Sequence, residues 1–291
     1  MALFNKRKRD VEPIVAISVV VLLLASGAVV SASFLSGYTD ADDFSVAPGR
    51  TVNVYYTGSL YGYYDDEGAI IFDTNVKEHA ENDDYVKIGG FSKSSYTKLS
   101  FVQGKGTVLS LFEEGVSGHK PGDVVRFKIP LGEGYKSEST ERDDSFEMPR
   151  VEYMTTTDFR AFYDDYVVKE GSAPVTIKTV YGWDATAYYD STVGMIKIIH
   201  TPEKDEKYDM VSNEKNVGGS VSLSVTAVGD TITCEYVVNV DSGVEDYMFW
   251  VKTHNDRFYI HGVESDKILT TVNPAAEEDI YFVVTIISVT E

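Results

Sequence analysis

The sequence contains very little of two kinds of residue that decide how a domain is held together and what it binds. Cysteine occurs once, as Cys234, so no internal disulfide is possible and no cysteine-rich metal motif exists. We interpret this thiol as a small buried hydrophobic residue. Basic residues are also scarce, because 26 lysines and arginines stand against 46 acidic residues, a formal charge of −20. Binding of nucleic acid requires a basic surface, so we predict no nucleic-acid partner.

Motifs of several enzyme classes are missing. No glycine-rich phosphate loop follows a strand pattern, and no Gly-x-Ser-x-Gly elbow occurs. The histidines lack the spacing of a metal site, and we interpret them as surface or loop residues. They are His79, His119, His200, His254 and His261. The sequence therefore predicts neither a metal site nor a cofactor.

Aromatic residues, by contrast, are plentiful. The chain has 20 tyrosines and 14 phenylalanines, which indicates a folded protein and not a disordered acidic chain. Its 291 residues are enough to bury a substantial core, and this length suggests about two domains.

The N-terminus carries a membrane signal. Four basic residues, Lys6 to Arg9, precede residues 13–36, a mostly apolar run without charge. About 20 such residues cross a bilayer core of about 30 Å, and positive charge marks the cytoplasmic side. We predict a cytoplasmic tail at 1–12 and a single transmembrane anchor at 13–36, with the main domain outside the cytoplasm. The alternative is a cleaved signal peptide, for which residues 30–32 offer small side chains.

Residues 101–135 predict one short helix between two strands. Val108, Leu109, Phe112 and Val116 fall on one face at helical spacing. Ser110 with Glu113 forms a Ser-x-x-Glu pattern, which predicts a capping box at the start of the helix. Gly118 and Pro121 end the helix, and residues 123–129 then alternate as a strand.

Four segments in a fixed order carry a family resemblance. They are Val52–Gly58, Phe72–Thr74, residues 101–135 and the apolar strand Ile280–Val289. Together they resemble the FKBP-type peptidyl-prolyl cis-trans isomerases, whose first strand reads Val-x-Tyr-Thr-Gly and is followed by Phe-Asp-Ser/Thr. The resemblance implies an α+β fold, an antiparallel half-barrel around one short helix. Residues 37–139 would be its first part and residues 273–291 its last strand.

The resemblance also implies a site for proline-containing peptides. Tyr56, Asp73 and Tyr135 would be its catalytic residues: Tyr135 offers a hydroxyl to a substrate carbonyl and Asp73 orients by hydrogen bonding. Phe112 would be the pocket floor, and Leu109 would present a backbone amide to the peptide. The substrate-binding residues implied in this way are Phe72, Phe101, Val108, Leu109, Phe112 and Phe282.

A long insertion interrupts the family pattern. Tyr135 and Ile280 are separated by 144 residues, where compact members of the family have a flap of about twenty. We therefore predict a mostly β insert at 140–272, long enough to hold two β-units, in the position called insert-in-flap. Because some family members carry a chaperone domain there, the resemblance implies a second contact with client proteins.

These observations favour a membrane-anchored isomerase that assists the folding of exported or membrane proteins. Its partners would be proline-containing unfolded or nascent polypeptides. Two alternatives remain open: a holdase chaperone whose isomerase site has decayed, and a structural envelope protein that uses β-units as spacers. An aromatic pocket open to solvent favours the enzyme, whereas a filled pocket with an apolar groove on the insert favours the holdase.

Overall fold

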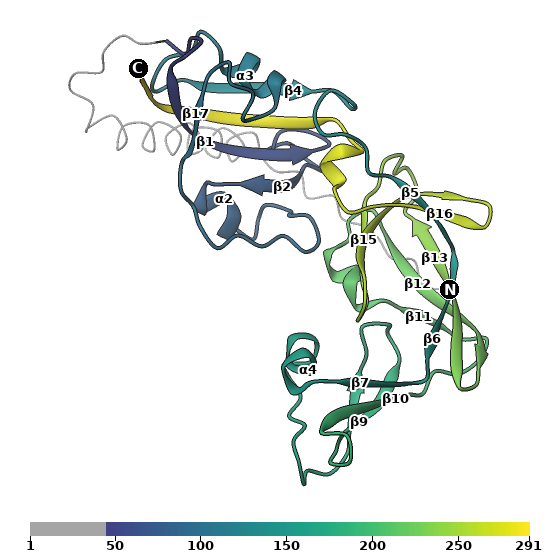
Figure 1. Ribbon diagram of the computed structural model, residues 1–291. Coiled ribbons are helices and arrows are strands. Elements are labelled where there is room, and N and C mark those ends of the chain that lie inside the picture. Colours follow the sequence, from purple (N-terminus) through teal and green to yellow (C-terminus); the bar gives the residue numbers. More distant parts are fainter. Residues whose placement is uncertain (1–44) are drawn as a thin grey trace, which may run out of the picture.

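The computed structural model describes residues 45–291. These residues form four antiparallel sheets with a few short helices, in agreement with the mostly antiparallel α+β fold expected from the sequence (Figure 1). Among them, no helix is long and apolar enough to cross a membrane. The tail predicted at 1–12 and the anchor predicted at 13–36 lie outside the described residues.

The first sheet is a half-barrel built around β1. Strand β17 pairs antiparallel with β1 along its whole length, from Thr51 opposite Thr290 to Leu60 opposite Ile280, and β4 pairs with the other edge of β17. Strands β3 and β2 share the free edge of β1, one at each end. The strands are β1 (Thr51–Leu60), β2 (Ile70–Thr74), β3 (Leu99–Val102), β4 (Val124–Ile129) and β17 (Ile280–Thr290). The last strand of the chain thus completes a sheet that begins at its other end.

Helix α3 (Ser110–Val116) packs on this sheet, and the shorter α2 (Lys77–Glu81) follows β2. The predicted capping box is wrong. The helix begins at Ser110, so this serine lies inside the first turn, and the N-cap residue Leu109 makes no side-chain cap hydrogen bond. The Glu113 carboxylate instead accepts hydrogen bonds from the backbone amides of Gly104 and Gly106, at 2.9 and 3.0 Å. Glu113 therefore ties the glycine turn before the helix to the helix itself.

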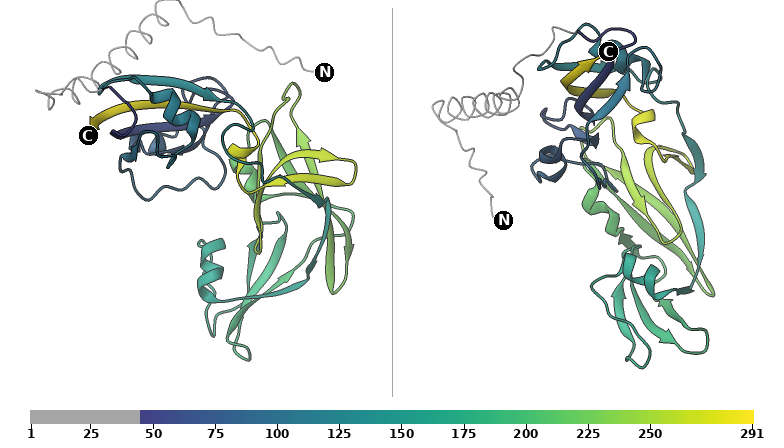
Figure 2. Two further views of the ribbon diagram at one scale, coloured as in Figure 1. Left: turned by 45° about the horizontal axis from the view of Figure 1, so that its top comes forward. Right: turned by 60° about the vertical axis from the view of Figure 1, so that its left-hand side comes forward.

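The expected insert, residues 140–272, spans β5 to β16 and contains two packed groups of strands (Figure 2). A sandwich is formed by the sheets β11-β12-β13-β6 and β14-β15-β16-β5. Its strands are β5 (Thr140–Asp143), β6 (Ser145–Pro149), β11 (Lys207–Asp209), β12 (Gly219–Val228), β13 (Thr231–Val240), β14 (Phe249–Lys252), β15 (Arg257–Glu264) and β16 (Lys267–Thr271), with the 3-10 helix η1 (Val211–Lys215) between β11 and β12. Cys234 is fully buried in the sandwich core, which confirms its interpretation as a small core residue.

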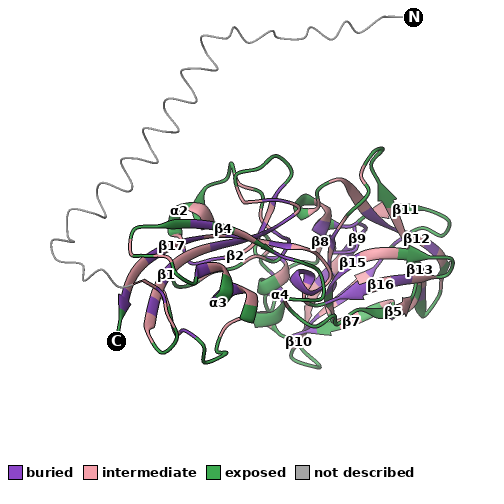
Figure 3. Ribbon diagram, turned by 90° about the horizontal axis from the view of Figure 1, so that it is seen from above, coloured by how far each residue is buried: buried purple, intermediate pink, exposed green. Residues whose placement is uncertain are grey.

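A smaller sheet is nested between β6 and β11. Its strand order is β7-β10-β9-β8. Its elements are β7 (Val151–Met154), α4 (Thr156–Phe162), β8 (Val175–Lys178), β9 (Asp184–Asp190) and β10 (Met195–His200). Phe159 of α4 and Ile196 and Ile198 of β10 are nearly or completely buried in its core. Buried segments run along the central strands of all the sheets (Figure 3).

The sandwich is packed directly against the half-barrel. The Tyr259 hydroxyl donates a hydrogen bond of 2.6 Å to the Gly89 carbonyl in the loop after β2. The Trp250 ring covers Gly89 and Gly90, and a Cβ atom at Gly90 would lie 2.9 Å from this ring. Only glycine allows so close an approach of an indole to the backbone. The 3-10 helix η2 (Pro274–Ala276) then leads from the sandwich into β17.

Candidate active site

An aromatic cluster lies between α3 and the half-barrel sheet. The Phe112 ring meets four neighbouring rings edge to face: Tyr56 and Phe101 at 6.0 Å between centroids, Phe127 at 5.5 Å and Phe282 at 5.1 Å. This is the favourable geometry for aromatic pairs. The segments that carry these rings are far apart in the sequence, and the sheet order brings them together. The floor predicted at Phe112 is 4 % exposed.

Gly58 makes room for two of these rings. It lies in β1 opposite Phe282, and a Cβ atom at this position would lie 2.6 Å from Cζ of Phe72 and 2.8 Å from Cε1 of Phe282. Real Cβ atoms do not approach so closely, so the two phenylalanines keep their positions only because residue 58 is glycine. The sequence motif contains this glycine, but its spatial role is visible only once β2 and β17 are placed beside β1.

Asp73 is the polar centre of the site. Its Oδ2 accepts a hydrogen bond from the Tyr56 hydroxyl, and its Oδ1 lies 2.6 Å from the Lys93 ammonium. Burial, together with the Asp73 carboxylate, raises the pKa of Tyr56 well above its usual value. Tyr56 therefore stays protonated and keeps donating to Asp73. The role of Lys93 could not be read from the sequence, because it lies in a serine-rich loop without a motif.

Tyr135 lies beside this carboxylate at the surface. It follows β4 in a short turn and is 37 % exposed. Burial of its hydroxyl and the charge of Asp73 raise its pKa, so it remains a hydrogen-bond donor at neutral pH. The remaining predicted residues, Val108 and Leu109, are half-buried just before α3 and pack against the half-barrel core. The structure thus brings the predicted site residues together around one wall of the half-barrel.

A second polar cluster lies in the insert, and for two of its residues, His200 and His254, the interpretation as surface or loop histidines was wrong. His200 at the end of β10 is fully buried, and His254, between β14 and β15, has a side chain only 2 % exposed. Both contact one oxygen of Glu152 on β7: His200 Nε2 at 2.9 Å and His254 Nδ1 at 2.5 Å. The three residues are far apart in the sequence, so their spacing carries no signal.

This cluster has the ligand types of a metal site, with three ligand atoms within 4.8 Å of one another. The hydrogen bond of 3.0 Å from the Trp183 indole to His200 Nδ1 argues against that use. An indole N–H only donates, so Nδ1 is an acceptor and the ring proton sits on Nε2. Nε2 then donates to Glu152 and has no lone pair for a cation. We interpret the cluster as a buried hydrogen-bonded junction between the nested sheet and the sandwich.

Comparison with known proteins agrees with the architecture of the half-barrel. The family model of FKBP-type peptidyl-prolyl cis-trans isomerases matches residues 43–154. The chain therefore carries an FKBP-type domain, and its enzyme class is peptidyl-prolyl cis-trans isomerase. The match ends with the last residue of β7, so it covers neither β17 nor most of the insert. No curated protein matches the chain.

Proposed function

We propose that the chain isomerises X-Pro bonds in exported or membrane proteins while they fold. The observation that carries this proposal is the arrangement around Asp73: its carboxylate is held by Tyr56 and Lys93, at the edge of the aromatic cluster around Phe112. Uncatalysed rotation of the X-Pro bond crosses a barrier of about 18–20 kcal/mol and takes tens to hundreds of seconds. It is therefore slow enough to limit folding.

The chemistry needs no nucleophile. Rotation breaks amide resonance, so a site accelerates it by binding the twisted amide better than the planar one. Apolar rings such as Phe112 and Phe282 exclude water from the less dipolar twisted form. The Tyr135 hydroxyl is available to donate to a carbonyl of the bound peptide. Asp73 holds Tyr56 in place and is itself held by Lys93, so the polar wall of the site is fixed before the substrate binds.

Substitution of the polar residues tests this proposal. Asp73→Ala and Tyr135→Phe should each lower kcat/KM about three- to tenfold. Asp73→Ala releases Tyr56 and Lys93, and Tyr135→Phe removes the hydroxyl offered to the substrate, where one hydrogen bond is worth about 0.5–1.5 kcal/mol. The unfolding midpoint should hardly change for Tyr135→Phe, because this side chain is partly exposed, and should fall modestly for Asp73→Ala, because the Tyr56 hydroxyl loses its acceptor. A protease-coupled proline-peptide assay with the full-length chain measures the rate. Asp83→Ala, an exposed carboxylate in the loop after α2, is the matched control.

The outcome also separates the enzyme from the holdase. The holdase alternative is favoured by Val151 and Tyr153, which are 37 % and 42 % exposed on β7, and by a groove of about 410 Å³ on the sandwich. If the protein is a holdase, the Asp73→Ala and Tyr135→Phe variants should suppress the aggregation of an unfolded protein as strongly as the wild type does. If the wild-type chain shows no proline-bond turnover at micromolar concentration yet suppresses aggregation, the isomerase proposal is wrong.

The same proposal places the folded part outside the cytoplasm, on a single-pass anchor. It is supported by the basic cluster before the uncharged residues 13–36. Protease added to intact cells should then remove residues 37–291 and leave the anchor. If the mature protein begins near residue 33 and is released in soluble form, the segment is a cleaved signal peptide and the anchor is wrong.

A further inference from the structure

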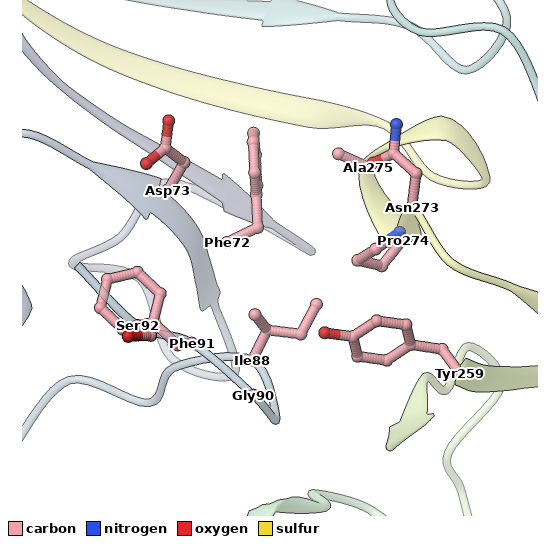
Figure 4. A pocket seen from close by; sticks show the side chains of 10 residues that line it. All are labelled: Phe72, Asp73, Ile88, Gly90, Phe91, Ser92, Tyr259, Asn273, Pro274 and Ala275. Atoms are coloured by element: carbon pink, nitrogen blue, oxygen red, sulfur yellow. The ribbon is translucent and has the colours of Figure 1, made fainter. Parts of the chain in front are cut away.

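A cleft opens where the sandwich meets the half-barrel, beside the candidate active site (Figure 4). Its volume is about 230 Å³. Three parts of the chain line it: β2 and the loop that follows, strand β15, and η2 with the residue before it. The lining residues are Phe72, Asp73, Ile88, Gly90, Phe91, Ser92, Tyr259, Asn273, Pro274 and Ala275.

The insert fixes the far wall of this cleft. The Tyr259 hydroxyl is hydrogen bonded to the Gly89 carbonyl, and the Trp250 ring lies on Gly89 and Gly90. Tyr259 is 7 % exposed and Ile88 8 % exposed, so both side chains are held by packing. The cleft is therefore formed before any ligand arrives, which lowers the entropic cost of binding there.

The cleft is continuous with the candidate active site. Phe72 and Asp73 belong to both: the Phe72 ring lies against Phe282 of the aromatic cluster at 5.9 Å between centroids, and Asp73 binds Tyr56. A polypeptide whose proline lies over the aromatic cluster is therefore close to the cleft, because the Phe72 ring contributes to both. Neighbouring residues of the same polypeptide are then within reach of the cleft, because an extended chain advances about 3.3 Å per residue.

The chemistry of the lining selects the kind of side chain that fits. The buried side chains of the lining, Ile88, Tyr259 and Ala275, are mostly apolar, whereas Asp73, Ser92 and Asn273 add polar groups. The Asp73 carboxylate at its edge is already paired with Lys93, so it offers no free charge to a ligand. A cavity of about 150 Å³ holds a benzene molecule. The cleft is larger, so a leucine, methionine or phenylalanine side chain has room.

We propose that this cleft is a second substrate subsite, which binds an apolar side chain flanking the isomerised proline. The proposal rests on the proposed function, since it assumes that the adjoining site binds proline peptides. It assigns the insert a direct part in substrate selection: Tyr259 supplies a wall of the subsite from the inserted sandwich. This wall comes from a residue outside the segment that the family model matches.

A peptide series tests the subsite. The parent peptide has one proline with about four serines on either side. In each variant, a single leucine replaces one of these serines. The positions on one side of the proline span ~13 Å of extended chain. With the full-length chain, one leucine position should raise kcat/KM about tenfold over the all-serine peptide, because its side chain contacts the buried apolar part of the lining, Ile88 and Tyr259. Titration calorimetry with the same peptides should show the same preference in Kd.

Two tryptophan substitutions locate the effect. Ser92 is exposed and lines the cleft, so Ser92→Trp should fill it from the rim and remove the leucine preference while sparing the all-serine peptide. Ser94→Trp, exposed in the same loop but outside the lining, should keep the preference. The proposal is overturned if no leucine position is preferred, or if the preference survives Ser92→Trp.

The subsite and the proposed function fail in different ways. Turnover of the all-serine peptide without any leucine preference leaves the isomerase intact and removes the subsite. A leucine preference in binding that is sensitive to Ser92→Trp, without turnover of any peptide, supports the subsite and contradicts the isomerase. Circular dichroism of both tryptophan variants should match the wild type, since both positions are on the surface.

Discussion

Gly58→Ala should lower kcat/KM for a proline peptide about a hundredfold. The new methyl group would lie 2.6 Å from the Phe72 ring and 2.8 Å from the Phe282 ring, so both rings must move. A displacement of about 1 Å in a positioned site costs about 10²-fold in rate. Overpacking a core adds about 1–3 kcal/mol of destabilisation. The assay is the protease-coupled turnover of a short peptide, with thermal unfolding followed in parallel.

The control for this substitution is Gly229→Ala. Gly229 is exposed in the turn between β12 and β13, and a Cβ atom there meets nothing closer than 3.8 Å. Gly229→Ala should therefore leave both kcat/KM and the unfolding midpoint unchanged. If Gly58→Ala lowers stability but leaves kcat/KM unchanged, the positions of Phe72 and Phe282 do not matter for catalysis. The aromatic cluster would then be core alone.

Local patterns in the sequence predicted single elements, and the family resemblance implied how they assemble into a half-barrel. The helical spacing around Phe112 corresponds to α3, and the apolar strand predicted from Ile280 corresponds to β17. These elements are specified by neighbours within a few residues, which is why period and turn residues reveal them. The start of α3 was predicted less well, because Glu113 has a competing partner in the glycine turn.

Features made by contacts between distant segments could not be predicted in the same way. Lys93 reaches Asp73 from a loop without a motif, and Tyr259 reaches the half-barrel from the insert. The buried Glu152 junction joins residues up to 102 positions apart. Each of these contacts depends on how the sheets pack on one another. The spacing of residues along the chain does not reveal that packing. The candidate site is thus predicted in its family motifs and missed in the residues that support them.

The Glu152 junction leads to the largest expected effect on stability. Glu152→Leu removes the carboxylate that both His200 and His254 contact, and leaves their N–H groups buried without an acceptor. A buried N–H group left without an acceptor costs about 1–3 kcal/mol, and here two such groups lose theirs. Urea unfolding followed by tryptophan fluorescence is a suitable measurement, because Trp183 is hydrogen bonded to His200. Turnover of a short peptide should not change, since the junction lies within the insert.

A glutamine variant shows whether the hydrogen bonds or the negative charge of Glu152 stabilise the junction. Glu152→Gln keeps an oxygen that both histidines can share, because both contact the same carboxylate oxygen. It should therefore cost less than the leucine variant, about 1–2 kcal/mol. Glu147→Gln on the exposed face of β6 is the matched control and should have no effect. Equal destabilisation by leucine and glutamine would mean that the charge, and not the shared acceptor, holds the junction.

The dependence of stability on pH provides a second measurement of the same junction. Burial alone would raise the pKa of Glu152, but hydrogen bonds from His200 and His254 outweigh it and lower the pKa to about 2. A carboxylate whose folded pKa lies below its unfolded value of about 4.5 stabilises the fold fully above that value. The stabilisation is then lost as the pH falls from about 4.5 to about 2, by about 3 kcal/mol at most. The wild-type chain should lose stability more steeply in this window than Glu152→Leu does, whereas parallel curves would show that Glu152 is not held as an anion in the folded protein.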